Sequence, residues 1–249
     1  MGEIKEDLYI FLRNSDVSTV SEFETKFSAR INLTQNCDFE CALARIVLPT
    51  NIANCYDGQF SFYSYTTKRM EHSRIAKAFY GSPSDFIRQW NEIIQENSEF
   101  YRLSLSETNH FAMELKQKEN SSVSPKLQLS QNIMELTGLP KEVNKNGFHI
   151  SEKSWDISGG QGLIYIYTNL TEWVHLNGSQ VPLLNVVSLN LENRPSNYDF
   201  EPKTRIYIPV QKRYIDNITV SLRNTHGIAY PFLNGEILIV LHIRPATIL

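Results

Sequence analysis

Two apolar segments near the C-terminal end of the sequence restrict the possible folds more than any other feature. Between Asn217 and Arg223, apolar residues alternate with polar ones, which is the period of a strand with one buried face and one wet face. Between Glu236 and Ile243, apolar residues occupy both faces, so this strand should be covered on both sides. Asn224 to Gly227 and the dipeptide Asn234-Gly235 favour chain reversals. The sequence therefore predicts that the chain ends in antiparallel sheet.

Strand-like patterns also fill most of the preceding sequence. Aromatic residues, which favour strands over long helices, are abundant, with 12 Tyr and 13 Phe. The first two strands are candidates for a hairpin. The predicted ranges are Leu8 to Arg13, Phe23 to Phe27, Cys41 to Leu48, Gln59 to Tyr65, Ser73 to Tyr80, Phe100 to Leu105, His110 to Leu115, Gly162 to Asn169 and Leu183 to Leu189.

Helical spacing occurs in two places. Ser82 is a capping residue followed by Pro83, and the apolar residues Phe86, Trp90 and Ile94 recur on one side of the segment. We predict a helix over 83–97, with Trp90 in the core. A shorter helix is predicted over 130–137, with Ser130 as its cap and Gly138 as its stop.

The length of 249 residues suits one large all-β domain as well as two small ones. Many strands, two short helices and mostly long connections favour an all-β fold, a single jelly-roll β-sandwich with one or two short helices in the connections. We predict one domain over 1–249 with a short N-terminal arm at 1–7. The polar segments 116–128 and 140–161 are predicted to be loop inserts, and 190–203 a polar loop.

Charge and hydropathy exclude several classes of partner. The net charge is −3 with both signs interspersed, so we expect no specific nucleic-acid partner. The apolar runs are too short for a membrane span, and the polar start MGEIKED predicts no secretion signal. The three cysteines Cys37, Cys41 and Cys55 are then expected to be reduced, buried thiols.

The common catalytic and nucleotide-binding motifs, such as H-E-x-x-H, G-x-x-x-x-G-K-[ST] and G-x-S-x-G, do not occur in the sequence, and we expect no enzyme activity, no catalytic or metal-binding residue and no cofactor. The glycine cluster Gly159 to Gly162 fits a plain loop before a strand better than a phosphate cradle. The cysteines with His72 equal four zinc ligands in number, but their spacing does not form two close pairs. His242 is expected to be a packing or hydrogen-bonding residue.

Two loose groups of basic residues could contact nucleic acid or an acidic surface of a neighbouring subunit, although a solvated strand edge is the simpler interpretation. The first group lies between residues 203 and 213, with Tyr207 nearby. The second lies between residues 68 and 77. Their members are Lys203, Arg205, Lys212 and Arg213 in the first group, and Lys68, Arg69, Arg74 and Lys77 in the second.

Ordered sequence blocks resemble the single jelly-roll minor capsid, or penton, proteins of Maverick/Polinton transposable elements and adintoviruses. Tyr207 to Tyr214 (YIPVQKRY) resembles the family's Y-x-P-V-Q-K-x-x block. Pro231-Phe232, Gly235 and Val240 to Arg244 resemble its ending, P-F-x-x-G followed by V-x-L-H-F-R. Weaker matches extend to the first strand, but the loops between 116 and 160 do not align with the family.

The resemblance implies a structural role in a virion. Five copies would form a ring at the fivefold vertices of an icosahedral capsid, beside a separate double jelly-roll major capsid protein. The protein would be made in the host-cell cytoplasm and have no catalytic residues.

A ligand-binding β-sandwich, for example a carbohydrate-binding or receptor-binding module, remains as the alternative function. Such a site needs exposed aromatic residues on a sheet face or a loop rim. The candidate residues are Tyr56, Tyr63, Tyr65, Trp155 and Trp173.

Overall fold

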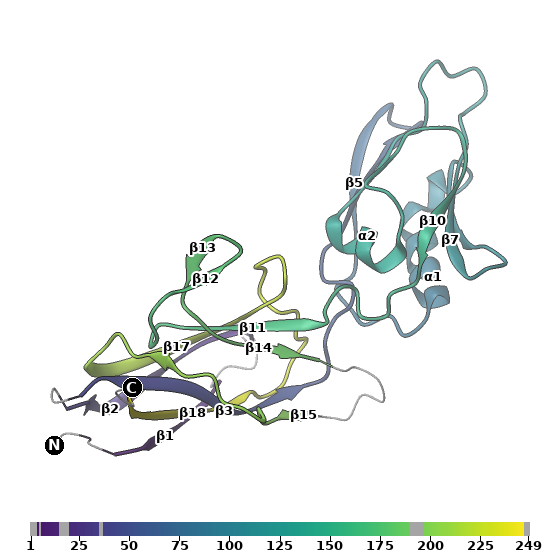
Figure 1. Ribbon diagram of the computed structural model, residues 1–249. Coiled ribbons are helices and arrows are strands. Elements are labelled where there is room, and N and C mark those ends of the chain that lie inside the picture. Colours follow the sequence, from purple (N-terminus) through teal and green to yellow (C-terminus); the bar gives the residue numbers. More distant parts are fainter. Residues whose placement is uncertain (1–3, 5, 15–19, 35–36, 190–196, 247–249) are drawn as a thin grey trace. The chain divides into compact units, whose positions relative to one another are not determined.

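The chain folds into two compact units, and each has its own hydrophobic core (Figure 1). The computed structural model describes residue 4 and residues 6–14, 20–34, 37–189 and 197–246. The first unit consists of residues 1–52 and 161–249, and the second, which we call the insert, of Ala53–Gly160. Residues 1–3 and 5 of the predicted arm lie outside the described residues.

The first unit is a sandwich of two antiparallel sheets. Its N-terminal and C-terminal segments both contribute to each sheet. The first sheet consists, in spatial order, of β1 (Leu8–Arg13), β18 (Leu238–Pro245), β3 (Phe39–Pro49) and β15 (Asn197–Phe200), with the short β16 (Ile208–Pro209) also paired with β3. The second consists of β14 (Leu183–Ser188), β11 (Leu163–Thr168), β17 (Tyr214–Arg223) and β2 (Glu22–Asn32).

This strand order is that of a jelly roll. The long strands of the unit, in chain order, are β1, β2, β3, β11, β14, β15, β17 and β18. The last of them lies between the first and the third, and the second last lies between the second and the fourth. Two interleaved Greek keys of this kind define the double-sheet jelly roll. The predicted fold class, an all-β jelly-roll sandwich with short helices in its connections, is confirmed.

The strand β18 is covered on both sides, as its sequence predicts. Its inward residues Ile239, Leu241 and Ile243 are fully buried in the sandwich core. On the outward side, Val240 and His242 are only 7% and 4% exposed. The neighbouring strand β3 is central as well, pairing with β18 and with both β15 and β16.

The hairpin considered for the first two strands does not form. β1 pairs with β18, whereas β2 pairs with β17 in the opposite sheet. In a jelly roll the chain crosses between sheets, so strands that are adjacent in sequence need not pair, and no local signal marks such a crossover. For the same reason β17 and β18, the two predicted C-terminal strands, lie in different sheets.

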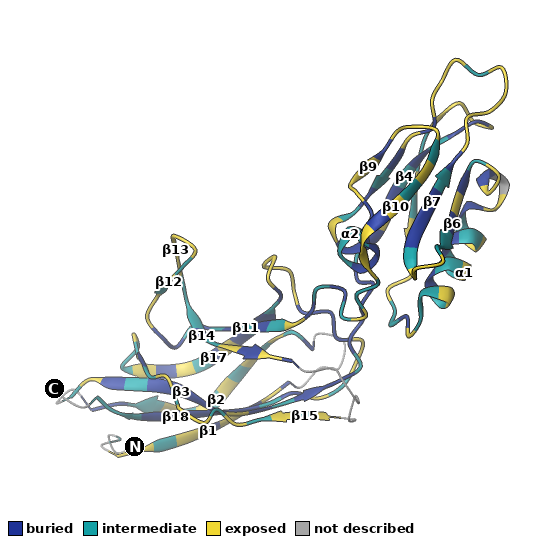
Figure 2. Ribbon diagram, turned by 45° about the vertical axis from the view of Figure 1, so that its right-hand side comes forward, coloured by how far each residue is buried: buried dark blue, intermediate teal, exposed yellow. Residues whose placement is uncertain are grey.

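The insert has two small sheets and two helices (Figure 2), and its hydrophobic core is rich in aromatic residues. One sheet has the order β5 (Arg69–Ile75), β4 (Gly58–Ser64), β8 (Leu127–Leu129) and β9 (Glu142–Val143). The other has the order β10 (Gly147–Ser154), β7 (His110–Leu115) and β6 (Tyr101–Leu105). A separate short hairpin, β12 (Val174–Leu176) with β13 (Ser179–Val181), belongs to the jelly roll.

Both predicted helices are present in the insert. α1 (Pro83–Ile94) continues into a 3₁₀ turn at Gln95–Asn97, and the Ser82 hydroxyl accepts a hydrogen bond from the Asp85 amide at 3.2 Å. Trp90 is 1% exposed and stacks on Phe60, which confirms its place in the core. α2 (Gln131–Thr137) ends at Gly138, whose φ is 71°. The predicted Ser130 cap makes no capping bond, because its hydroxyl donates to the Asp57 carbonyl instead.

The division into two units corrects the predicted single domain over 1–249. The segment 140–161 is not a loop insert, since it contains β9 and β10. The segment 116–128 has no strand or helix up to residue 126, and β8 begins at Leu127. Asn197–Phe200, within the predicted polar loop 190–203, is strand β15. Polar sequence misleads here because β10 and β15 lie at sheet edges, where one strand face and one backbone edge can stay in water.

Two buried asparagines, Asn54 and Asn132, connect separate segments of the insert through side-chain hydrogen bonds. The Asn132 Oδ1 accepts hydrogen bonds from the amides of Tyr56 and Asp57 at 2.8 and 3.0 Å, and its Nδ2 donates to the Asn54 carbonyl at 2.9 Å. The Asn54 side chain in turn bonds both backbone groups of Tyr80. Gly159 has a φ of 57°, and an added Cβ would collide with the Asn54 carbonyl. The Asn54 Nδ2 also donates to the Ile157 carbonyl at 3.1 Å, so side-chain amides hold the start and the end of the insert together.

We expect Asn132→Ala to destabilise the insert by about 2–4 kcal/mol, because two buried backbone amides lose their acceptor. Urea unfolding of a Trp173→Phe variant measures this directly, since the remaining Trp90 and Trp155 both belong to the insert. Gln131→Ala, at an exposed neighbouring position of α2, is the control and should leave the midpoint unchanged. Equal midpoints for the two variants would contradict the role of Asn132.

Candidate functional site

Two exposed aromatic residues mark the outer side of the first sheet of the jelly roll. On β1, Ile10 and Leu12 point into the core, whereas Tyr9 and Phe11 point outward and are 49% and 67% exposed. Tyr9 lies opposite His242, and Phe11 lies opposite Val240. We call this surface, defined by Tyr9, Phe11, Val240, His242 and the adjoining Arg205, the aromatic face.

His242 is the centre of a hydrogen-bond network on the aromatic face. Its Nδ1 lies 2.7 Å from the Tyr207 hydroxyl, and its Nε2 lies 3.1 Å from a carboxylate oxygen of Asp7. A neutral imidazole with its proton on Nε2 satisfies both contacts, donating to Asp7 and accepting from Tyr207. The ring also stacks on Tyr9 at 4.5 Å between centroids. His242 is therefore a hydrogen-bonding and packing residue, as the sequence predicts.

Most charges on this side of the sheet are paired. Arg244 lies 3.6 Å above the Tyr207 ring and forms an ion pair with Glu40 at 2.6 Å. Arg45 and Asp199 make a two-pronged contact, and the hydrogen bond from Arg45 lowers the pKa of the Asp199 carboxyl. Arg205 differs, because its contacts within the described residues are with Tyr9, Tyr207 and His242, none of them acidic.

The opposite sheet has an open pocket of about 770 Å³ on its outer side. Residues of β2, β11 and β17 form most of its lining, and Val181 and Pro182, at the end of the short hairpin, close one side. We call this surface the pocket face. The residues that line the pocket are Glu22, Phe23, Glu24, Tyr167, Thr168, Asn169, Val181, Pro182, Thr219, Val220, Ser221 and Arg223.

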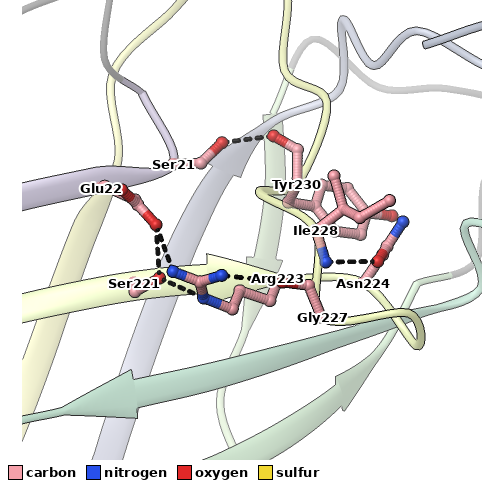
Figure 3. A network of polar contacts seen from close by, with 8 residues as sticks. All are labelled: Ser21, Glu22, Ser221, Arg223, Asn224, Gly227, Ile228 and Tyr230. Carbon is pink, nitrogen blue, oxygen red and sulfur yellow. Dashed lines mark hydrogen bonds and ion pairs between the residues drawn. The ribbon is translucent and has the colours of Figure 1, made fainter. Parts of the chain in front are cut away.

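A polar network around Arg223 holds one end of the pocket (Figure 3). The guanidinium donates to Glu22 at 2.7 Å, to the Ser221 hydroxyl at 3.0 Å and to the Gly227 carbonyl at 2.7 Å. Beside it, the Ile228 amide donates to Asn224, and the Ser21 hydroxyl donates to the Tyr230 carbonyl. The network joins β2, β17 and the turn after β17, so the pocket lies on a fixed framework.

Glu24, also in the pocket lining, has a weaker contact. Its carboxylate lies 3.7 Å from the exposed Lys26 ammonium, a distance at which a surface ion pair contributes little. The Tyr167 hydroxyl is protonated at neutral pH and can donate a hydrogen bond, and burial raises its pKa further. The pocket therefore combines apolar walls with a carboxylate that can accept a new cationic partner.

The two predicted basic groups lie in different units, and the members of the first group do not act together. Arg205 belongs to the aromatic face. Arg213 instead donates to the carbonyls of Thr34 and Cys37 and pairs with Asp38, so it connects Thr34, after β2, with the residues just before β3. The second group extends from Lys68, in the turn between β4 and β5, along β5 to Lys77. The interpretation as a solvated strand edge fits the second group. In the first group, Arg205 and Arg213 have the two different roles described above.

The glycine cluster and the three cysteines are the remaining candidates from the sequence. Gly159 and Gly160 lie in a turn with positive φ, as a plain loop before β11 requires. Cys41 and Cys55 are buried thiols and Cys37 is half-buried; all three are free. Across the described ranges, no group of three or more His, Cys, Asp or Glu residues is placed to hold a metal ion. Nor does any helix in that part of the chain have the length and apolarity to cross a membrane.

Of the five aromatic candidates for a sugar site, only Trp173 is exposed. Four of them belong to the insert, where Tyr56 and Tyr65 are buried and Trp155 packs against the core. Trp173, at 58% exposure, belongs to the jelly roll. The alternative ligand-binding function is therefore not favoured by these residues.

The sequence did not reveal Phe11 or the Glu22–Arg223 pair as surface features. In the run LYIFLR every residue but the last is apolar or aromatic, so alternation cannot tell the buried face from the exposed one. Glu22 and Arg223 are 201 residues apart in sequence, and nothing local predicts their contact.

Comparison with known proteins finds similarity among solved structures and not among sequences. No protein-family model matches the chain, and no curated protein matches it. A crystal structure of the selenomethionine-labelled mavirus penton protein aligns with a TM-score of 0.48 and 10% sequence identity, over 97% of this chain and 100% of that one. The jelly roll of the present chain is established by its own strand order.

We predict that a thiol reagent at mildly alkaline pH labels only Cys37 in the folded protein. Burial raises the pKa of the Cys41 and Cys55 thiols to about 12, so both stay protonated and unreactive, as well as shielded. Mass spectrometry after labelling should show one modified cysteine before unfolding and three in denaturant. Rapid labelling of a folded Cys37→Ser variant would contradict this.

Proposed function

We propose that the protein is a structural minor capsid, or penton, protein of the Maverick/Polinton and adintovirus type, without enzyme activity. Five copies form a closed ring at the fivefold vertices of an icosahedral capsid. The observation that carries the proposal is that one complete jelly roll is built by the segments whose sequence resembles this family. Jelly rolls recur in viral capsid domains, and also in lectins and cupins, so the fold supports the proposal together with the sequence blocks.

The family-like blocks hold the sandwich together. Within Tyr207 to Tyr214, Ile208–Pro209 pairs with β3. Arg213 donates hydrogen bonds to the carbonyls of Thr34 and Cys37, which precede β3 in the sequence. Tyr207 contacts both His242 and Arg244 in the terminal block. Residues 240–244 form the centre of β18. Resemblance concentrated in such positions supports a shared fold and, with it, a shared structural use.

Assembly would use rigid surfaces with little rearrangement. Each sheet face is fixed by strand pairing and by a common core, so neighbours in a ring can meet preformed surfaces. Individual contacts can be weak, because a closed ring and a complete shell repeat them many times. The partners are further copies of this chain and a double jelly-roll major capsid protein. The site of action is the virion, after synthesis in the host-cell cytoplasm.

Light scattering of the full chain across a concentration series tests the ring. We expect a concentration-dependent rise to the molar mass of five 28.7 kDa chains, with no larger open-ended species, because a closed ring leaves no free contact surface. Negative-stain images of the same fractions should show fivefold rings. A monomer at every concentration, or filaments of undefined length, would contradict the proposal.

A further inference from the structure

We propose that the aromatic face of one copy docks on the pocket face of the next copy, with Phe11 seated in the pocket and Arg205 facing Glu24. This inference rests on the proposed function and specifies which residues join neighbouring subunits. The two surfaces lie on the outer sides of the two different sheets of the same sandwich.

The exposed apolar area on β1 is the first argument. Phe11 is 67% exposed at the centre of a strand whose other aromatic residue, Tyr9, is 49% exposed. Residues two apart on one strand face are about 7 Å apart, so the two rings form one apolar surface, beside the nearly buried Val240. Continuous apolar surface of this kind marks interaction sites, and buried aromatic anchors dominate the energy of protein interfaces.

The pocket fits such an anchor. It is open, its volume of about 770 Å³ leaves ample room for a phenylalanine ring, and Tyr167, Val181 and Pro182 contribute apolar walls. Its floor is sheet, held by the Arg223 network (Figure 3). A ring inserted there would lose its remaining exposure to water without any strand having to move.

Charge complementarity selects a second copy as the occupant and the opposite face as its docking surface. Pairing the aromatic face with itself would bring together two surfaces that each contain the cationic Arg205, and pairing the pocket face with itself would bring together two surfaces that each contain Glu22 and Glu24. Pairing the aromatic face with the pocket face places the Arg205 guanidinium, which has no acidic partner among the described residues, against Glu24, which has only a 3.7 Å contact with an exposed lysine. Opposite charges at an interface fix its register, and like charges oppose the alternatives.

The symmetry of the contact agrees with a ring. An interface between two different surfaces of the same protein is heterologous, so an open chain of copies keeps one free face of each kind, at its two ends, until rotation closes the assembly. A self-complementary interface would stop at two copies. The proposed contact therefore provides the type of interface that a five-membered ring needs.

The first experiment removes the anchor. Sedimentation velocity across a concentration series of full-length Phe11→Ala should show self-association weakened about 30-fold or more, the scale expected for loss of a central aromatic anchor. Phe148→Ala is the matched control, because Phe148 is a similarly exposed phenylalanine, 69% against 67%, on β10 of the insert. The control should associate as the unmodified protein does. Equal melting temperatures would show that neither exposed substitution disturbs folding.

The second experiment reverses the charges. Arg205→Glu and Glu24→Arg should each weaken association about 10-fold or more, and the variant with both changes should recover most of the loss, since the pair is then reversed but still complementary. Arg102→Glu, on an exposed residue of β6 in the insert, is the charge control and should have no effect.

The outcomes separate this inference from the proposed function. Normal ring formation by Phe11→Ala, or failure of the double charge reversal to recover association, would overturn the contact while leaving the ring in place. Weakening by Phe11→Ala with no effect of Glu24→Arg would assign the aromatic face to a different surface and also overturn the contact. An unmodified protein that stays monomeric at every concentration would overturn both proposals.

Discussion

The position of β18 between β1 and β3 is the constraint on which the rest of the structure depends. β18 pairs along its whole length with β3, and from Leu238 to Ile243 with β1 from the start of the chain. It contributes Ile239, Leu241 and Ile243 to the core. Its outward residues Val240 and His242 are also buried, so the strand is packed on both of its faces. The sandwich can close only after nearly the whole sequence has been made, a consequence of its long-range pairing.

The insert satisfies a different constraint, since it leaves the jelly roll after β3 and must return before β11. Among the described residues, its core shares no buried residue with that of the sandwich, and it contains aromatic pairs such as Phe60 with Trp90. Asn54 and Asn132 supply buried hydrogen bonds at its base, where the backbone is irregular and cannot satisfy itself. An interruption of this kind costs the sandwich little, because the inserted chain folds around its own core.

The sequence predicted most elements, because strand alternation and helix capping are local. Leu8–Arg13 and His110–Leu115 have the predicted bounds, and α1 follows Ser82-Pro83 as expected. The pairing of strands and the two-unit division were not predictable from these signals, since both depend on contacts between residues far apart, such as Glu22 with Arg223. Polar edge strands such as β10 resemble loops. The exposed faces were also missed, because Phe11 in an apolar run resembles a core residue until its neighbours are known.

These constraints leave two preformed outer faces on the jelly roll, one with projecting aromatic rings and one with a pocket, and the account depends on both being covered by neighbouring copies. Hydroxyl-radical footprinting of dilute and concentrated protein, read by mass spectrometry at single side chains, tests this most directly. The account predicts that oxidation of Phe11, Tyr9 and Tyr167 falls on assembly, while oxidation of Phe148 in the insert stays constant. Protection of Phe148 with unchanged oxidation of Phe11 and Tyr167 would contradict it.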